Sequence, residues 1–141
     1  MTETALTDRW VSVARACAQI NQAAERVLAE NHGLCASAFE IMDVMVREDD
    51  WIRAGELSSR VSRSQPQVSR LLAQMITAGY AERRPCATDR RGFDARLTPA
   101  GHALFAQSAT TMETVLRELA ESSAEVRDVM ASRPPETAPA P

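Results

Sequence analysis

The chain has 141 residues, of which 45% are hydrophobic and 25% are charged. This length fits one domain, and the composition is that of an ordinary folded protein rather than a disordered chain. No segment approaches the ~18 uninterrupted apolar residues of a membrane span. The opening residues MTETALTDRW also lack the basic and then apolar order of a signal peptide. We therefore expect a cytoplasmic protein with no membrane partner.

The net charge of −3 conceals a strong asymmetry along the chain. Residues 51–100 hold nine arginines against four acidic residues, whereas both flanking segments are acidic. A basic segment inside an acidic protein indicates that this segment binds a polyanion. All sixteen basic residues are arginine, whose planar guanidinium suits phosphates and guanine edges. Because the absence of lysine extends to segments without a basic patch, we attribute it to genomic base composition.

An apolar residue recurs every three or four positions over residues 8–31, which predicts a long amphipathic helix. We expect Asp8 or Thr7 to cap this helix and Gly33 to end it in a left-handed conformation. The stripe consists of Trp10, Val13, Cys17, Ile20, Ala24 and Val27.

Three short helices are predicted next. The Ser37-x-x-Glu40 capping box starts a buried helix that ends near residue 50, and residues 53–61 form a second, with Leu57 and Val61 inward. A tight turn precedes the Ser64-x-x-Gln67 capping box, which starts a third helix that ends at Gly79. The core face of this third helix consists of Val68, Leu71, Leu72 and Met75.

After Gly79 the hydrophobic period changes from that of a helix to that of a strand. Residues 80–84 and 93–97 predict a β-hairpin with a long polar tip. Thr98-Pro99 then caps a long helix, and Ser122-x-x-Glu125 caps a last short one. Residues 133–141, rich in proline, are expected to be disordered.

Two short helices joined by a tight turn and followed by an Arg-rich hairpin make a winged helix–turn–helix. The predicted fold is mainly α, with a small β-hairpin wing and long N- and C-terminal dimerisation helices. Burial of the apolar stripe leaves Gln65, Gln67, Ser69 and Arg70 on the outer surface of the recognition helix, where they can meet base edges. At the hairpin tip, Arg90 and Arg91 can enter a minor groove, while Asp89 is expected to turn inward and pair with an arginine.

The segment from Gly55 to Gly101 resembles the DNA-binding lobe of the MarR family (multiple antibiotic resistance regulators). The most specific motifs are QVSRLL at 67–72, AGYAER at 78–83, DRR at 89–91 and LTPAG at 97–101. The resemblance implies a homodimer that binds pseudo-palindromic double-stranded DNA, usually as a repressor. It also implies a small phenolic or other lipophilic effector that releases the DNA. We expect no cofactor.

The resemblance places the dimerisation region at 1–36 and 99–132 and the winged lobe at 37–98. Matching positions make Ser64–Arg70 the groove-entering segment and Asp89 with Arg91 the wing motif. Arg53 stands where the family often has a capping threonine, which makes it a candidate phosphate contact. The predicted DNA-binding residues are Arg53, Ser64, Gln65, Pro66, Gln67, Ser69, Arg70, Arg84, Asp89, Arg90 and Arg91.

Other functional classes have less support. No Gly-rich phosphate loop, Gly-x-Ser-x-Gly motif or metal-binding histidine pair is present, so we do not expect an enzyme or a metal site. A winged-helix module that binds proteins, or a redox sensor that uses Cys17, Cys35 or Cys86, remains an alternative. At Cys17 we favour a buried, inert thiol, and we expect Cys86 to be exposed. No effector-binding residue is assigned.

Overall fold

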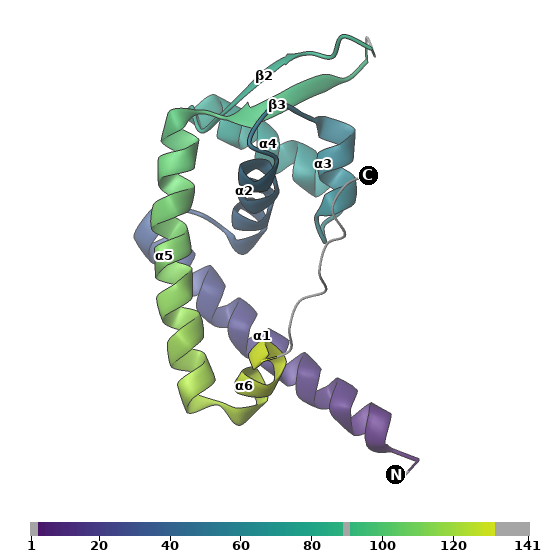
Figure 1. The fold of residues 1–141 in the computed structure, drawn as a ribbon, viewed down its shortest axis with the longest axis vertical. Helices are drawn as coiled ribbons and strands as arrows, with labels where there is room; N and C mark the ends of the chain where they lie inside the picture. Colours follow the sequence, from purple (N-terminus) through teal and green to yellow (C-terminus); the bar gives the residue numbers. More distant parts are fainter. Residues whose placement is uncertain (1–2, 89–90, 132–141) are drawn as a thin grey trace.

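The computed structural model describes residues 3–88 and 91–131. Six helices and three strands follow one another within these residues (Figure 1). In chain order they are α1 (Ala5–His32), α2 (Ala36–Glu48), β1 (Ile52–Arg53), α3 (Ala54–Arg60), α4 (Gln65–Ala78), β2 (Ala81–Pro85), β3 (Phe93–Leu97), α5 (Pro99–Ser122) and α6 (Ala124–Ala131). The predicted mainly helical fold with a β-hairpin wing is confirmed. The predicted disordered tail lies outside the described residues.

Helices α1, α5 and α6 pack against one another and form a helical region beside the winged lobe (Figure 1). Small side chains line the contacts, which lets the helix backbones approach closely. The buried residues are Ala16, Ala23, Ala24, Leu28, Ser108, Val115 and Val126. Nε2 of His32, at the end of α1, lies 2.6 Å from the Thr111 hydroxyl of α5, which ties the two long helices together. Among the described helices, none has the length and apolarity needed to cross a bilayer.

The predicted face of α1 is only half correct. Ala24 is buried and Ile20 and Val27 are partly buried, but Trp10 is 68% exposed and Cys17 is also exposed. In this part of the helix, α1 meets α6 through Ser12 and Arg15, which bond to Glu125, and not through Trp10 or Cys17. The expectation of a buried Cys17 is therefore wrong.

The caps of the helices follow the predictions at four sites and depart from them at three. Ser64 and Thr98 cap α4 and α5 as predicted, and Gly33 and Gly79 adopt the left-handed conformation that ends α1 and α4. Helix α1 begins earlier than predicted, after Thr4, and neither Thr7 nor Asp8 caps it. Cys35, not Ser37, caps α2, because Ser37 is already inside the helix and buried. Ser123, not Ser122, caps α6.

The winged lobe encloses one apolar core under a three-stranded sheet. All four predicted core residues of α4 are buried, as are Leu57 and Val61. The strand order is β1-β3-β2 and both pairings are antiparallel, which confirms the predicted hairpin. Strand β1 was not predicted, because it is only two residues long and adjoins the predicted helix at 53–61; Ile52 pairs with Ala95 and is buried.

Substitution of Gly101 tests the junction between the wing and α5. A Cβ at Gly101 would collide with the carbonyl oxygen of Tyr80 and lie 3.2 Å from Leu97 Cδ2. We expect Gly101→Ala to lower the free energy of unfolding by about 1–3 kcal/mol, measured in urea. The control is Gly55→Ala in α3, whose Cβ would enter open space and should be neutral or slightly stabilising. Equal stability of the two variants would contradict this packing.

Candidate nucleic-acid interface

The N-terminal half of α4 presents a polar surface to solvent. The Ser64 hydroxyl accepts a hydrogen bond from the Gln67 N–H at 3.4 Å, and Pro66 occupies the first turn, where its missing N–H costs nothing. Because Val68, Leu71 and Leu72 point into the core, the rotation of the helix about its axis is set. The structure therefore exposes five of the predicted DNA-binding residues together: Ser64, Gln65, Pro66, Ser69 and Arg70.

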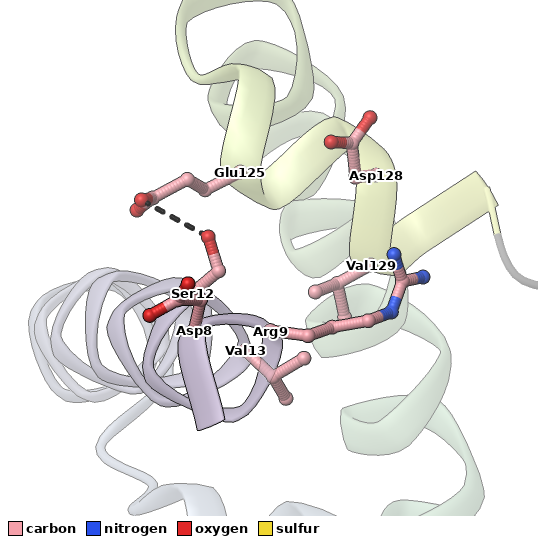
Figure 2. A pocket seen from close by; sticks show the side chains of 7 residues that line it. All are labelled: Asp8, Arg9, Ser12, Val13, Glu125, Asp128 and Val129. Carbon is pink, nitrogen blue, oxygen red and sulfur yellow. Dashed lines mark hydrogen bonds between the residues drawn. The ribbon is translucent and has the colours of Figure 1, made fainter. Parts of the chain in front are cut away.

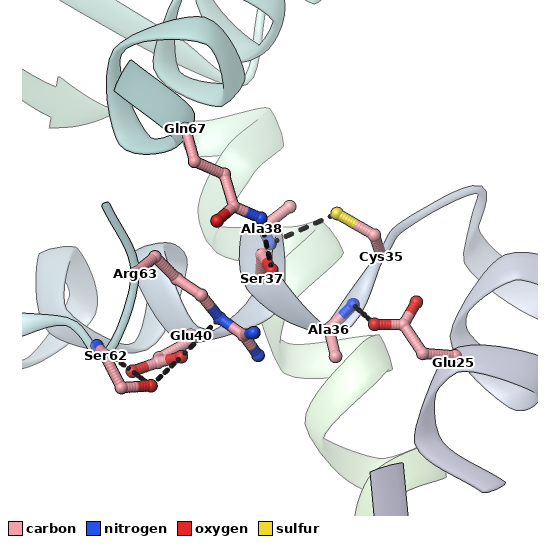
Figure 3. Close-up of polar contacts among 9 residues, drawn as sticks. All are labelled: Glu25, Cys35, Ala36, Ser37, Ala38, Glu40, Ser62, Arg63 and Gln67. Carbon is pink, nitrogen blue, oxygen red and sulfur yellow. Dashed lines mark hydrogen bonds and ion pairs between the residues drawn. The ribbon is translucent and has the colours of Figure 1, made fainter. Parts of the chain in front are cut away.

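Gln67 differs from these neighbours because its side chain turns inward. Its Nε2 donates a hydrogen bond to the Ser37 hydroxyl of α2 at 3.2 Å (Figure 3). Ser37 is buried, so this bond satisfies a polar group in the interior. In this conformation the Gln67 amide holds α4 against α2 and does not face outward with Gln65 and Arg70.

A second polar tie joins α2 to the turn before α4. The Glu40 carboxylate accepts hydrogen bonds from the Ser62 N–H at 2.7 Å, from the Ser62 hydroxyl at 2.8 Å and from Arg63 Nε at 3.3 Å (Figure 3). Burial acts to raise the pKa of Glu40, but the hydrogen bonds from Ser62 and the charge of Arg63 outweigh it, so this pKa lies below its usual value. The ionised carboxylate thus fixes the turn of the helix–turn–helix.

The outer face of the wing carries a cluster of paired charges. Arg84 lies 3.3 Å from the Asp94 carboxylate, and Arg96 is paired with Glu82 at 2.6 Å. Both guanidinium groups also lie over the Trp51 ring, at 4.4 and 4.3 Å from its centroid. Arg84, a predicted DNA-binding residue, is therefore already occupied by protein partners.

Of the remaining predicted site residues, Arg53 and Arg91 are described by the structure. Arg53 is exposed and stands in extended conformation directly before α3, and Arg91 is exposed at the wing tip. Asp89 and Arg90 lie outside the described residues. Sequence reasoning did not identify Trp51, Ser37 or Glu40 as part of the site's framework. The only signal was the Ser37-x-x-Glu40 spacing, which we assigned to a helix cap.

The three cysteines are separate free thiols. Cys17 is exposed, whereas Cys35 and Cys86 are half-buried, so Cys86 is less accessible than predicted. The Cys35 sulfur accepts a hydrogen bond from the Ala38 N–H at 3.4 Å, as the cap of α2 (Figure 3). Within residues 3–88 and 91–131, no three His, Cys, Asp or Glu side chains group in a way that could hold a metal ion.

The Glu40 tie predicts a specific pH dependence of stability. Because the pKa of Glu40 is lower in the folded state, its stabilising effect is complete above its unfolded pKa and is lost as the pH falls through the folded value. We expect Glu40→Gln to cost about 1 kcal/mol of unfolding free energy near pH 7, and this difference from wild type to shrink below about pH 4. Urea unfolding measures both. Glu118→Gln, at an exposed position of α5, is the control, and a difference that is constant with pH would contradict the assignment.

Comparisons with known proteins agree with this geometry. The sequence model of the MarR family matches residues 32–92. Among solved structures, MarR from E. coli in its apo form is 21% identical with a TM-score of 0.71, over 84% of this chain and 88% of that one. A cysteine-to-serine mutant of the same protein, complexed with operator DNA, is 25% identical with a TM-score of 0.66, over 84% and 88% of the two chains.

A third similar structure is Sco3205, a MarR family transcriptional regulator from Streptomyces coelicolor, in complex with DNA. It is 20% identical with a TM-score of 0.72, over 93% of this chain and 88% of that one. A search of curated protein sequences gave no match. Residues 32–92 therefore match the MarR family, and the chain as a whole has the fold of MarR-family regulators.

Proposed function

We propose that this chain is a sequence-specific transcriptional regulator that binds double-stranded DNA as a homodimer and acts as a ligand-responsive repressor. The observation that carries the proposal is the exposed N-terminal face of α4. On this face Arg70 lies beside an Arg-rich wing. Among the described residues, no carboxylate lies within ion-pairing distance of Arg70. The solved complexes of similar proteins with DNA support the same reading.

The chemistry of this face suits base recognition in the major groove. Arg70 can donate two hydrogen bonds to O6 and N7 of guanine, and Gln65 can bridge N6 and N7 of adenine. Ser64 and Ser69 can donate to a base or a phosphate. Because these side chains are exposed and the helix is fixed by its buried face, DNA can reach them without rearrangement of the lobe.

Four exposed apolar side chains support the homodimer. Within the part of the chain that the structure describes, the large hydrophobic residues that stand exposed are Leu6, Trp10, Val13 and Met130, all on α1 or α6. Beside them, α1 and α6 enclose a groove of about 490 Å³ (Figure 2), where Ser12 donates to the Glu125 carboxylate at 3.3 Å. A second copy on this face would cover surface that one protomer leaves exposed. Two recognition helices would then lie about one DNA turn apart.

A second cavity supports the response to an effector. It has a volume of about 360 Å³ and lies where the loop after α1 meets α2, α4 and Tyr80, which precedes β2. Leu34, Leu71 and Met75 make much of its lining apolar, while Cys35 and Tyr80 add polar atoms. A small lipophilic or phenolic molecule fits this chemistry. Because the cavity contacts α4, its occupation would move the recognition helix and weaken DNA binding.

The proposed function is tested by fluorescence anisotropy with DNA from upstream of the chain's own gene and with scrambled DNA, at two salt concentrations. Site-specific binding predicts a preference for the upstream fragment and a steep loss of affinity with salt. Selection of bound fragments from the whole genome extends the test to distant sites. Absence of binding to any duplex at low salt would overturn the proposal in favour of a protein-binding winged helix.

Arg70→Ala is expected to weaken binding to the preferred DNA by about 1–3 kcal/mol, because a base contact is lost. Arg47→Ala removes the same charge from α2, where Arg47 is paired with Asp43, and should have little effect. Both affinities come from the same anisotropy titration. A harmless Arg70→Ala would instead favour the protein-binding module.

The dimer surface is tested by placing a charge on it. Sedimentation of the wild type should give a dimer at micromolar concentration. Trp10→Asp should raise the dissociation constant at least about tenfold, because truncation of a central interface aromatic often costs ~2 kcal/mol or more. Gln22→Glu adds the same charge on another side of α1 and is the control. Far-UV circular dichroism checks that the helices persist, and a wild-type monomer would remove the two-fold geometry.

A further inference from the structure

A groove separates the recognition helix from the wing. Its volume is about 320 Å³. One wall is the side of α4 formed by Ser69, Ala73, Ile76 and Thr77, and the other consists of Arg83 and Phe93 from the hairpin. The groove begins at Ser69, one of the exposed residues at the N-terminal end of α4. It therefore adjoins the surface proposed above to read DNA bases.

Arg83 is the cationic side chain in the lining of this groove. It pairs with Ala95 in the antiparallel register, so it lies on the same face of the hairpin as the buried Ala81 and Leu97. Its guanidinium carbon lies over the Phe93 ring, 5.6 Å from the ring centroid, in a cation–π contact. Within the described ranges, no carboxylate lies within ion-pairing distance of Arg83.

Arg84, the next residue, has the opposite environment. Successive side chains of a strand point to opposite faces, so Arg84 lies on the outer face with Asp94 and Trp51. Its charge is balanced by the Asp94 carboxylate at 3.3 Å. Both arginines are exposed, but their surroundings differ. Among the described residues, Arg84 has a carboxylate partner and Arg83, in the groove, has none.

Resting on the proposed function, we infer that Arg83 binds a DNA phosphate in the groove between α4 and the wing, and that Arg84 does not contact DNA. A helix in the major groove and a wing tip in the neighbouring minor groove stand on either side of one sugar–phosphate strand. That strand must pass between α4 and the hairpin, where this groove lies. The Arg83 guanidinium can donate two parallel hydrogen bonds to one phosphate, and the Ser69 hydroxyl on the opposite wall can add another.

The test compares two variants that remove the same charge from neighbouring residues, Arg83→Gln and Arg84→Gln. We expect Arg83→Gln to weaken binding to upstream and scrambled DNA by the same factor of about ten, and to lower the slope of log affinity against log salt by about 1. Arg84→Gln should change either affinity by less than about threefold and leave the slope unchanged. The reason is that salt screens the interaction between the DNA and a charge that does not contact it. Arg83→Lys keeps the charge but cannot donate two parallel hydrogen bonds to one phosphate. Its affinity for DNA should therefore lie between those of Arg83→Gln and Arg84→Gln.

Phosphate ethylation interference gives a second readout that does not depend on stability. Ethylation of the phosphate bound by Arg83 should block the wild type and Arg84→Gln, but should no longer affect Arg83→Gln. Thermal unfolding checks that all variants are folded. Equal affinities and equal ethylation patterns for Arg83→Gln and Arg84→Gln, with Arg70→Ala still impaired, would overturn this inference alone. If the wild type binds no duplex at all, the proposed function fails and the inference fails with it.

Discussion

Burial of one apolar stripe on α4 determines which of its residues are exposed and which line the groove beside the wing. Val68, Leu71, Leu72 and Met75 are each less than a tenth exposed, so α4 cannot rotate about its axis without exposing them. This constraint directs Gln65, Ser69 and Arg70 outward. It also turns the side of α4 that contains Ala73 and Ile76 toward the wing, and so creates the groove with Arg83. One hydrophobic contact thus sets both the exposed polar face of α4 and the groove beside the wing.

Polar contacts then fix what hydrophobic packing leaves adjustable. An apolar core tolerates small sliding motions, whereas a hydrogen bond requires a particular distance and direction. Helix α2 supplies two such contacts, from Ser37 to Gln67 on α4 and from Glu40 to the turn at Ser62 and Arg63. The Trp51 ring, with Arg84 and Arg96 above it, gives the outer face of the wing a similar fixed geometry. Helix α4 and the wing are therefore held relative to α2 and to β1 by directional interactions.

Local signals were enough to predict the elements whose stabilising partners are close in sequence. Helix α4 has a cap at Ser64, an apolar stripe and a terminal glycine, and the structure confirms all three. Glu40 and Gln67 were assigned to local caps, but both bind groups far along the chain. The face of α1 was predicted only in part, because Ser12 and Arg15, not the apolar stripe, meet α6 over its N-terminal half. The contrast between Arg83 and Arg84 required the strand register, which composition does not contain.

The two tryptophans stand in separate regions of the molecule. Trp51 lies in the winged lobe beneath two guanidinium groups, while Trp10 is 68% exposed near the N-terminus of α1. Indole emission responds to neighbouring charge and to water, so each ring is a built-in optical probe of its own surroundings. Replacing either one with phenylalanine would leave a single emitter. Events at the wing and events at the N-terminal part of α1 could then be followed separately in the same protein, without any attached dye.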